Sequence, residues 1–189
     1  MMSILPLDEL NRLNTEIRER FGKESLQKRD KREEEDIIDE MLDLFLLAYA
    51  MGNSTVNNDL SSDYSPSVDE VMKVVDAKVA GKTWRERVED YFSNGGTGED
   101  IARIADTETH RIANQAAYET AKAAGATEKT WHCMMLPTSR DTHIYLDGVS
   151  APIDGEFYSF KGGSTMYPGQ WGIAEEDVNC LCWLTYTKG

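Results

Sequence analysis

The stretch between Thr97 and Gly125 constrains the fold more than any other part of the sequence. Thr97 followed three residues later by Asp100 indicates a helix N-terminus, and Gly125 is typical of the residue that follows a helix C-terminus. The apolar residues between these signals recur at helical spacing, and several are alanines: Ile101, Ile104, Ala105, Ile112 and Ala116. We therefore predict one long helix with a small-residue face, which serves as the spine of a compact domain.

The preceding half of the chain predicts further helices. Leu5, Leu10, Leu13 and Ile17 recur at intervals of about one turn, and residues 37–51 are apolar on most sides. A helix as widely apolar as 37–51 must be covered by other protein, either by this chain's own bundle or by an assembly partner. Residues 52–67 are rich in Gly, Asn, Ser and Asp, which predicts a loop and a domain boundary between 1–65 and 66–189. Ser67 with Glu70 then signals the start of the next helix.

After Gly125 the pattern changes from helix to strand. Three segments rich in aromatic and β-favouring residues are flanked by turn residues: 129–136, 156–160 and 180–187. They predict a small antiparallel sheet packed on the spine helix. The expected fold class is α+β, with an N-terminal helical region followed by a compact domain in which a long helix packs on a small antiparallel sheet.

Charge and composition exclude several classes of partner. The 189 residues include 20 Lys and Arg against 34 Asp and Glu, for a net charge of −14. This balance opposes direct nucleic-acid binding, which needs clustered basic residues, and suits docking onto a basic protein surface. No secretory signal is apparent, and the most apolar stretch, 41–51, is far shorter than the roughly 20 residues of a bilayer span. We expect a cytosolic protein without a membrane partner, whose three cysteines are free thiols or metal ligands.

Two groups of polar residues are candidates for structural fastening. Glu108, Arg111 and Gln115 share one face of the spine helix and predict a partly buried polar network. Thr138 and Asp141 predict a capping box for a short helix, on which His143 and Asp147 stand four residues apart on one face. That pair can chelate a metal or orient a general base, but we favour a structural hydrogen bond or ion pair.

The cysteines suggest a second kind of site. If residues 180–186 form a strand, Cys180 and Cys182 project from the same face, where two thiolates can hold a soft metal such as zinc. The remaining ligands would be His143 and Cys133. Buried reduced thiols are the favoured alternative, and a redox or nucleophilic role, including Cys133 with His143 as its base, is disfavoured. We expect no cofactor, with zinc as the one candidate.

Taken together, "ADTETHRIANQAAYETAKAAG", "SRDTHIYLDG" and "EEDVNCLC" resemble the phage Mu protein F-like family of minor head proteins over about residues 80–187. The family's three motifs fall in order on Thr107, Glu108, Arg111 and Asn114; on Arg140, His143, Asp147 and Gly148; and on Asn179, Cys180 and Cys182. The chain departs from the family at two places. It has Leu181 where Arg is common, and before the second motif it reads "CMMLPTS" where family members commonly have an Asp and an Arg.

The resemblance implies a structural protein of a tailed bacteriophage rather than an enzyme. It implies a minor capsid protein of the virion interior, acting in head morphogenesis in the host cytoplasm and associated with the portal and with major capsid or scaffold protein. The helical region 1–65 matches nothing specific in the family, but the broadly apolar residues 37–51 predict that it docks onto these partners through residues 1–51. Residues 66–189 would form the minor head domain, with no toxin or nuclease module behind it. In that domain five polar residues would fix helix against sheet: Glu108, Arg111, Asn114, Arg140 and Asp147. The alternative is a metal-dependent hydrolase of peptide or nucleic acid that uses His143, Asp147 and the Cys180/Cys182 pair.

Overall fold

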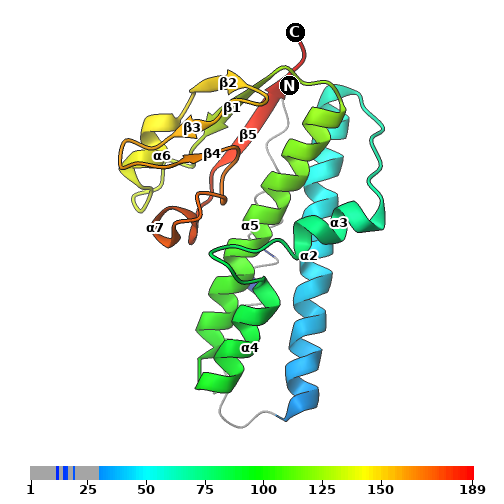
Figure 1. Cartoon of the computed structure of the whole chain (residues 1–189), viewed down its shortest axis with the longest axis vertical. Coiled ribbons are helices and arrows are strands. Elements are labelled where there is room, and N and C mark those ends of the chain that lie inside the picture. The colour runs from blue at the N-terminus through cyan, green and yellow to red at the C-terminus, as the bar shows by residue number, and fades with distance from the viewer. Residues whose placement is uncertain (1–11, 13–14, 17–18, 20–29) are drawn as a thin grey trace.

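The computed structural model describes residues 12, 15–16, 19 and 30–189, so the predicted helix through Leu5, Leu10, Leu13 and Ile17 lies outside it. The described helices are α2 (Lys31–Leu60), α3 (Val68–Val75), α4 (Trp84–Asn94), α5 (Gly98–Ala123), α6 (Asp141–Leu146) and α7 (Ala174–Asp177). The strands are β1 (Glu128–His132), β2 (Ser150–Pro152), β3 (Phe157–Tyr158), β4 (Ser164–Thr165) and β5 (Trp183–Thr187). The predicted α+β class is confirmed (Figure 1).

Helices α2 and α5 run side by side in the same direction and form the long axis of the molecule (Figure 1). Asp30 begins α2 with a capping box to Glu33. The broadly apolar segment 37–51 lies within α2, and its large side chains Met41 and Phe45 are buried in a core that α2 shares with α3, α4 and the first half of α5. Of the two alternatives that the sequence allowed, burial in the chain's own bundle or against an assembly partner, the structure shows the first for these side chains.

The loop predicted for residues 52–67 is wrong over its first half, because α2 continues to Leu60. Gly52 faces the backbone of Ala113 on α5, where any larger residue would collide. Asn53 donates from Nδ2 to Thr120 Oγ1 at 2.8 Å, and Asn57 donates from Nδ2 to the Tyr64 carbonyl at 2.8 Å. The small and polar residues that suggested a loop instead lie on a helix, where they make contacts with α5 and with Tyr64.

The spine helix forms as its end signals predict. Thr97 and Asp100 make a reciprocal capping box at the start of α5, and Gly125 follows its end at φ +80°. The Ala126 N–H donates to the Ala121 carbonyl at 2.9 Å, which closes the last turn in the manner of a Schellman motif. The first half of α5 supplies the core shared with α2, and its second half supplies Ala117, Tyr118 and Ala121 to a second core beneath the sheet.

The sheet differs from the prediction in its third strand. Its order is β2-β1-β5 with antiparallel pairing throughout, and β1 lies in the centre. The segment predicted at 156–160 does not join it: β3 pairs with β4 in a separate ribbon, across a turn at Gly162 and Gly163, both at positive φ. Gly148, at φ +76°, turns the chain so that β2 takes the free edge of β1. None of the described helices is both long enough and apolar enough to cross a membrane.

Candidate functional site

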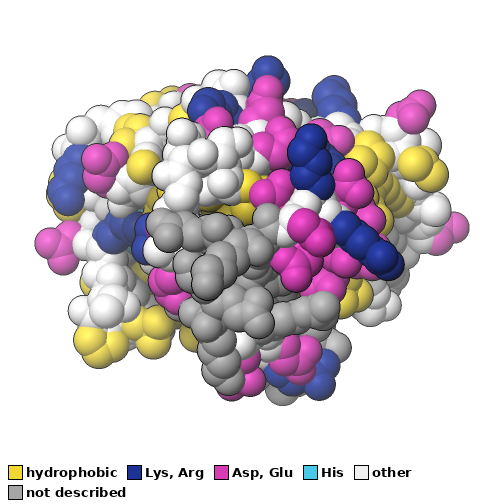
Figure 2. All heavy atoms as spheres, turned by 90° about the horizontal axis from the view of Figure 1, so that it is seen from below, with side chains coloured by type: hydrophobic (Ala, Val, Ile, Leu, Met, Phe, Trp, Pro, Cys, Tyr) yellow, Lys and Arg dark blue, Asp and Glu magenta, His cyan; other side chains and the backbone are white. Residues whose placement is uncertain are grey.

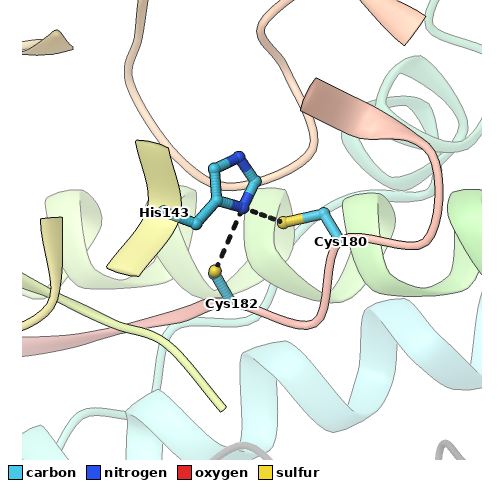
Figure 3. A group of neighbouring side chains, drawn as sticks. All are labelled: His143, Cys180 and Cys182. Atoms are coloured by element: carbon cyan, nitrogen blue, oxygen red, sulfur yellow. Dashed lines mark hydrogen bonds between the residues drawn. The ribbon is translucent and has the colours of Figure 1, made fainter. Parts of the chain in front are cut away.

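His143 meets two cysteines from a distant part of the sequence, Cys180 and Cys182, beside α5 (Figure 3). His143 lies on α6, and the two cysteines lie in the segment between α7 and β5. The imidazole Nδ1 is 3.6 Å from Cys180 Sγ and 3.4 Å from Cys182 Sγ. All three side chains are buried, and their ligand atoms lie within 4.8 Å of one another.

The cysteines reach His143 by a turn and not by strand alternation. β5 begins at Trp183, so the prediction that both cysteines lie in this strand is wrong. Asn179, at φ +56°, adopts the left-handed conformation that Asn tolerates better than most residues, and the Cys180 N–H donates to the Asp177 carbonyl at 3.2 Å. This turn directs both thiols toward one imidazole nitrogen.

The polar contacts around α6 also differ from the prediction. No side chain caps the start of α6, so the expected Thr138–Asp141 capping box is absent there. Asp147 does not pair with His143, because its Oδ1 accepts the backbone N–H of Cys133 at 2.8 Å and so ties the end of α6 to the end of β1. Arg140 donates from Nη2 to the Val178 carbonyl and braces the segment that leads to the cysteines.

The far side of the imidazole faces a buried carboxylate. His143 Nε2 lies 3.1 Å from Glu176 Oε2, close enough for an ion pair although the atoms are not aligned for a hydrogen bond. The same Oε2 accepts the Thr142 hydroxyl at 2.8 Å. Trp171 stacks on the imidazole at a centroid distance of 6.1 Å, and Trp131 meets it edge-on at 5.8 Å. These neighbours fix the orientation of the ring.

The two thiols differ in acidity. Hydrogen bonds from Cys182 and from His143 hold the pKa of Cys180 well below its usual range, in spite of burial. The hydrogen bond to Cys180 and burial raise the pKa of Cys182. Cys180 is therefore the thiol that ionises first, with Cys182 as its donor.

A small cavity of about 40 Å³ lies beside this cluster. Its walls include Cys133, Arg140, His143, Asn179 and Cys182. Three of the four predicted metal ligands thus come together, whereas Cys133 contributes to the cavity wall and is not part of the close group. A cavity of this size has room for a few water molecules.

We predicted that Glu108 and Arg111 would fix α5 against the sheet. The network around Glu108 instead fastens α5 to other helices. Arg111 donates from Nε to Glu108 Oε2 at 2.6 Å and from Nη2 to the Val74 carbonyl at 3.1 Å, which anchors the end of α3. It also donates to Gln115 Oε1 at 3.0 Å, and Arg87 of α4 donates to the other Glu108 oxygen. Both Glu108 and Arg111 are almost completely buried.

Two other residues of the helix motif do hold the cysteine segment. Asn114 donates from Nδ2 to the Cys182 carbonyl at 3.0 Å, and Thr107 Oγ1 accepts the Asn179 N–H at 3.4 Å. No sequence pattern singled out Glu176, Trp171 or Thr142 as neighbours of His143. The only available signal was that Glu176 lies four residues before Cys180 in "EEDVNCLC".

Comparison with known proteins identifies this arrangement of motifs. The chain matches the family described as "Phage Mu protein F like protein" over residues 68–185. It is 32% identical over 148 residues to the NAD(+)--arginine ADP-ribosyltransferase EFV of Enterococcus faecalis (strain ATCC 700802 / V583), covering 60% of this chain and 30% of that protein. It is 34% identical over 85 residues to minor head protein GP7 of Bacillus phage SPP1, covering 43% of this chain and 28% of that protein.

The chain spans less than a third of the length of each of these two relatives. No solved structure matches it. The family match nevertheless extends from the start of α3 into β5, and so takes in all three motifs and every side chain of the His143 cluster. The chain belongs to the phage Mu protein F-like family.

Proposed function

We propose that this protein is a minor head protein of a tailed bacteriophage, which acts in head morphogenesis and associates with the portal or with the inner face of the capsid shell. Membership in the phage Mu protein F-like family carries this proposal, together with the similarity to the minor head protein of phage SPP1. The protein would assemble in the host cytoplasm and remain inside the virion.

The way in which the motif residues are used supports a structural role. Asn114, Arg140 and Asp147 each direct their side chains to backbone groups of the same domain. A residue committed to such internal contacts stabilises the domain and is not free to act on a substrate. Binding to other head components then falls to the outer surface.

That surface is acidic at the lower end of the bundle. Acidic side chains gather there with a few basic ones between them (Figure 2), and residues 33–36 of α2 are all acidic. Together with the net charge of −14, this favours a basic protein surface as the partner over the nucleic acid inside the head.

The docking site proposed for residues 1–51 is restricted by the fold. The inner side of α2 is buried against α5, whereas Leu46 and Leu47 on its outer side are 36% and 43% exposed. We assign docking to this outer side, together with residues 1–29. Portal protein is the first partner to test, and major capsid or scaffold protein is the second.

The rival function is a metal-dependent hydrolase, and the site gives it little support. Asp147 is engaged by the Cys133 N–H, and the cavity beside His143 measures about 40 Å³. Pockets that bind small molecules usually measure about 300 Å³ or more. A peptide or nucleotide would not fit beside this imidazole.

The decisive experiment has two parts. Mass spectrometry of purified heads, with cross-linking, should find the protein inside the head and cross-linked to portal or shell protein. A protein absent from purified heads would end the proposal.

Co-expression with the portal protein then tests the docking surface. Deleting all of residues 1–51 would remove most of α2 and with it the core, so the appropriate variant starts at Asp30 and carries Leu46→Ser and Leu47→Ser. Its association should fall at least about 10-fold, which corresponds to about 1.4 kcal/mol. A matched control, Tyr145→Ser with Phe160→Ser, alters an exposed aromatic pair on α6 and the β3–β4 turn and should bind normally. The docking assignment fails if the first variant binds normally or if only the control loses binding.

A further inference from the structure

We propose that His143 Nδ1, Cys180 Sγ and Cys182 Sγ bind a zinc ion, which fastens α6 to the segment that precedes β5. Zinc prefers tetrahedral coordination, with bonds of about 2.0–2.1 Å to imidazole nitrogen and about 2.3 Å to thiolate sulfur. Those bond lengths place a nitrogen and a sulfur ligand about 3.6 Å apart. The observed N–S separations of 3.6 Å and 3.4 Å agree with this spacing.

Hydrogen bonding alone accounts poorly for this geometry. Nδ1 of an imidazole carries either one proton or one lone pair in the plane of the ring, so it makes one good hydrogen bond whether it donates or accepts. Cys180 and Cys182 nevertheless both lie within 3.6 Å of the same Nδ1. One cation at the common focus of three ligand atoms satisfies all of them at once (Figure 3).

The surroundings of His143 fit a metal ligand. Imidazoles that bind metals usually direct their other nitrogen to a carboxylate or carbonyl, which fixes the tautomer and the orientation of the ring. Glu176 occupies this position, with Oε2 3.1 Å from His143 Nε2. With the ring proton on Nε2, the Nδ1 lone pair faces the two sulfurs.

The ligand chemistry selects the ion. Two thiolates and an imidazole are soft and borderline ligands, which favour zinc over magnesium or calcium. Two thiolates also neutralise the charge of a divalent ion, and a neutral complex is compatible with the burial of Cys180 and Cys182.

The fourth coordination position faces the small cavity, because His143 and Cys182 both contribute to its wall. Water in that cavity completes the tetrahedron in our assignment. Cys133 lines the same cavity but lies outside the close group of ligand atoms, so it is not a ligand. It is therefore the matched control for substitutions of the other two cysteines.

The ion would reinforce a connection that the Arg140–Val178 and Thr142–Glu176 hydrogen bonds already make. It joins α6 to the cysteine segment, which α5 holds through Asn114 and the Cys182 carbonyl. Because the ligands assemble only in the folded state, zinc binding adds to the free energy of unfolding. Its role is to stabilise the domain, independently of what the outer surface binds.

The test uses the full chain, stripped with a chelator under reducing conditions and then titrated with zinc. We expect equimolar zinc by elemental analysis, a rise in melting temperature on zinc addition, and a thiolate-to-cobalt charge-transfer band when Co²⁺ replaces zinc. Cys180→Ser with Cys182→Ser should weaken zinc binding by about 100-fold or more and abolish this band. Cys133→Ser should bind zinc and cobalt like the unsubstituted protein.

Each contrary result is decisive. Wild-type protein that takes up no zinc and melts at the same temperature with and without it would overturn the site. Loss of zinc in Cys133→Ser would overturn the three-ligand assignment. If the double variant fails to fold, His143→Gln provides the same test, because it keeps both thiols and removes the third ligand; zinc affinity equal to that of the wild type would then reject the site.

Discussion

Gly52 of α2 lies so close to Ala113 of α5 that a Cβ atom on Gly52 would stand 2.2 Å from the Ala113 carbonyl oxygen. The atom in the way belongs to the backbone of a buried helix and cannot move aside by a rotamer change. Gly52→Ala should therefore destabilise the protein by about 1–3 kcal/mol, measured by urea denaturation, although alanine favours helix over glycine by about 1 kcal/mol.

The exposed neighbour Ser54 provides the control for helix propensity. Ser54→Ala should leave the free energy of unfolding within about 0.5 kcal/mol of the wild type. If Gly52→Ala behaved like Ser54→Ala, the two helices would not be in close contact at Gly52.

Arg111 should be one of the most sensitive positions of the bundle. Its removal leaves the buried Glu108 with only Arg87 and takes away the side-chain donor that the Val74 and Val75 carbonyls share. Arg111→Met should cost about 3–5 kcal/mol, the usual effect of breaking a buried ion pair from one side. Arg103→Met is the control, because its pair with Asp100 is 3.4 Å long and partly exposed, and its loss should cost about 1 kcal/mol or less. Equal losses in the two variants would mean that the Glu108 network adds no stability.

His110 should make the protein sensitive to mild acid. Burial lowers the pKa of His110 to about 4, and neither ring nitrogen has a hydrogen-bond partner among the described residues. In the unfolded chain this histidine has a pKa near 6.5, so between pH 6.5 and pH 4 it is protonated in the unfolded state but not in the folded state. The free energy of unfolding that is present above pH 6.5 is therefore lost as the pH falls toward 4. The loss is about 1.4 kcal/mol per pH unit at most, or about 3 kcal/mol in all.

Comparison of His110→Leu with the wild type isolates this contribution. The variant should lose less stability between pH 6.5 and pH 4.5, measured by denaturant midpoints at each pH, and His132→Gln should retain most of the wild-type slope. Parallel curves for wild type and His110→Leu would show that His110 is protonated equally well in both states.

Glu176 should act on zinc affinity through His143. Glu176→Gln removes the negative charge that faces Nε2, and loss of such a partner usually weakens metal binding by about 10- to 100-fold. Zinc competition assays measure the effect, and Glu175→Gln on the exposed side of α7 is the matched control. Identical affinities for the two variants would remove Glu176 from the metal site.

The elements that the sequence predicted best are those specified by local signals. Helix α5 has its capping box, its closing glycine and its small apolar face within one stretch of chain, so its limits follow from nearest neighbours. The far end of α2 was missed because Gly52 and Asn53 are loop residues by local preference. Their helical state depends on Ala113 and Thr120, which are distant in sequence.

The candidate site likewise combines features that local sequence specifies with features that depend on distant residues. The resemblance brought His143 and the cysteines together as motifs, but their geometry depends on the left-handed turn at Asn179, which no pattern of residue types specified. Glu176 reaches His143 because the Asp177 carboxylate accepts the N–H groups of Trp171 and Gly172 and so folds α7 inward. Lys129 was overlooked although alternation places it on the same face as Trp131; it is buried and donates to the Met166 carbonyl at 2.8 Å.

Because α5 runs without interruption through both cores, it couples their unfolding. One half of the helix is needed to bury Phe45 and Trp84, and the other half is needed to bury Trp131 and Leu184. Helix formation is cooperative along the chain, so fraying that starts under the sheet spreads toward the bundle, and the reverse also holds. The helical bundle and the sheet should therefore unfold in one cooperative transition. Calorimetry should record a single peak, whereas a chain with two independent cores would give two.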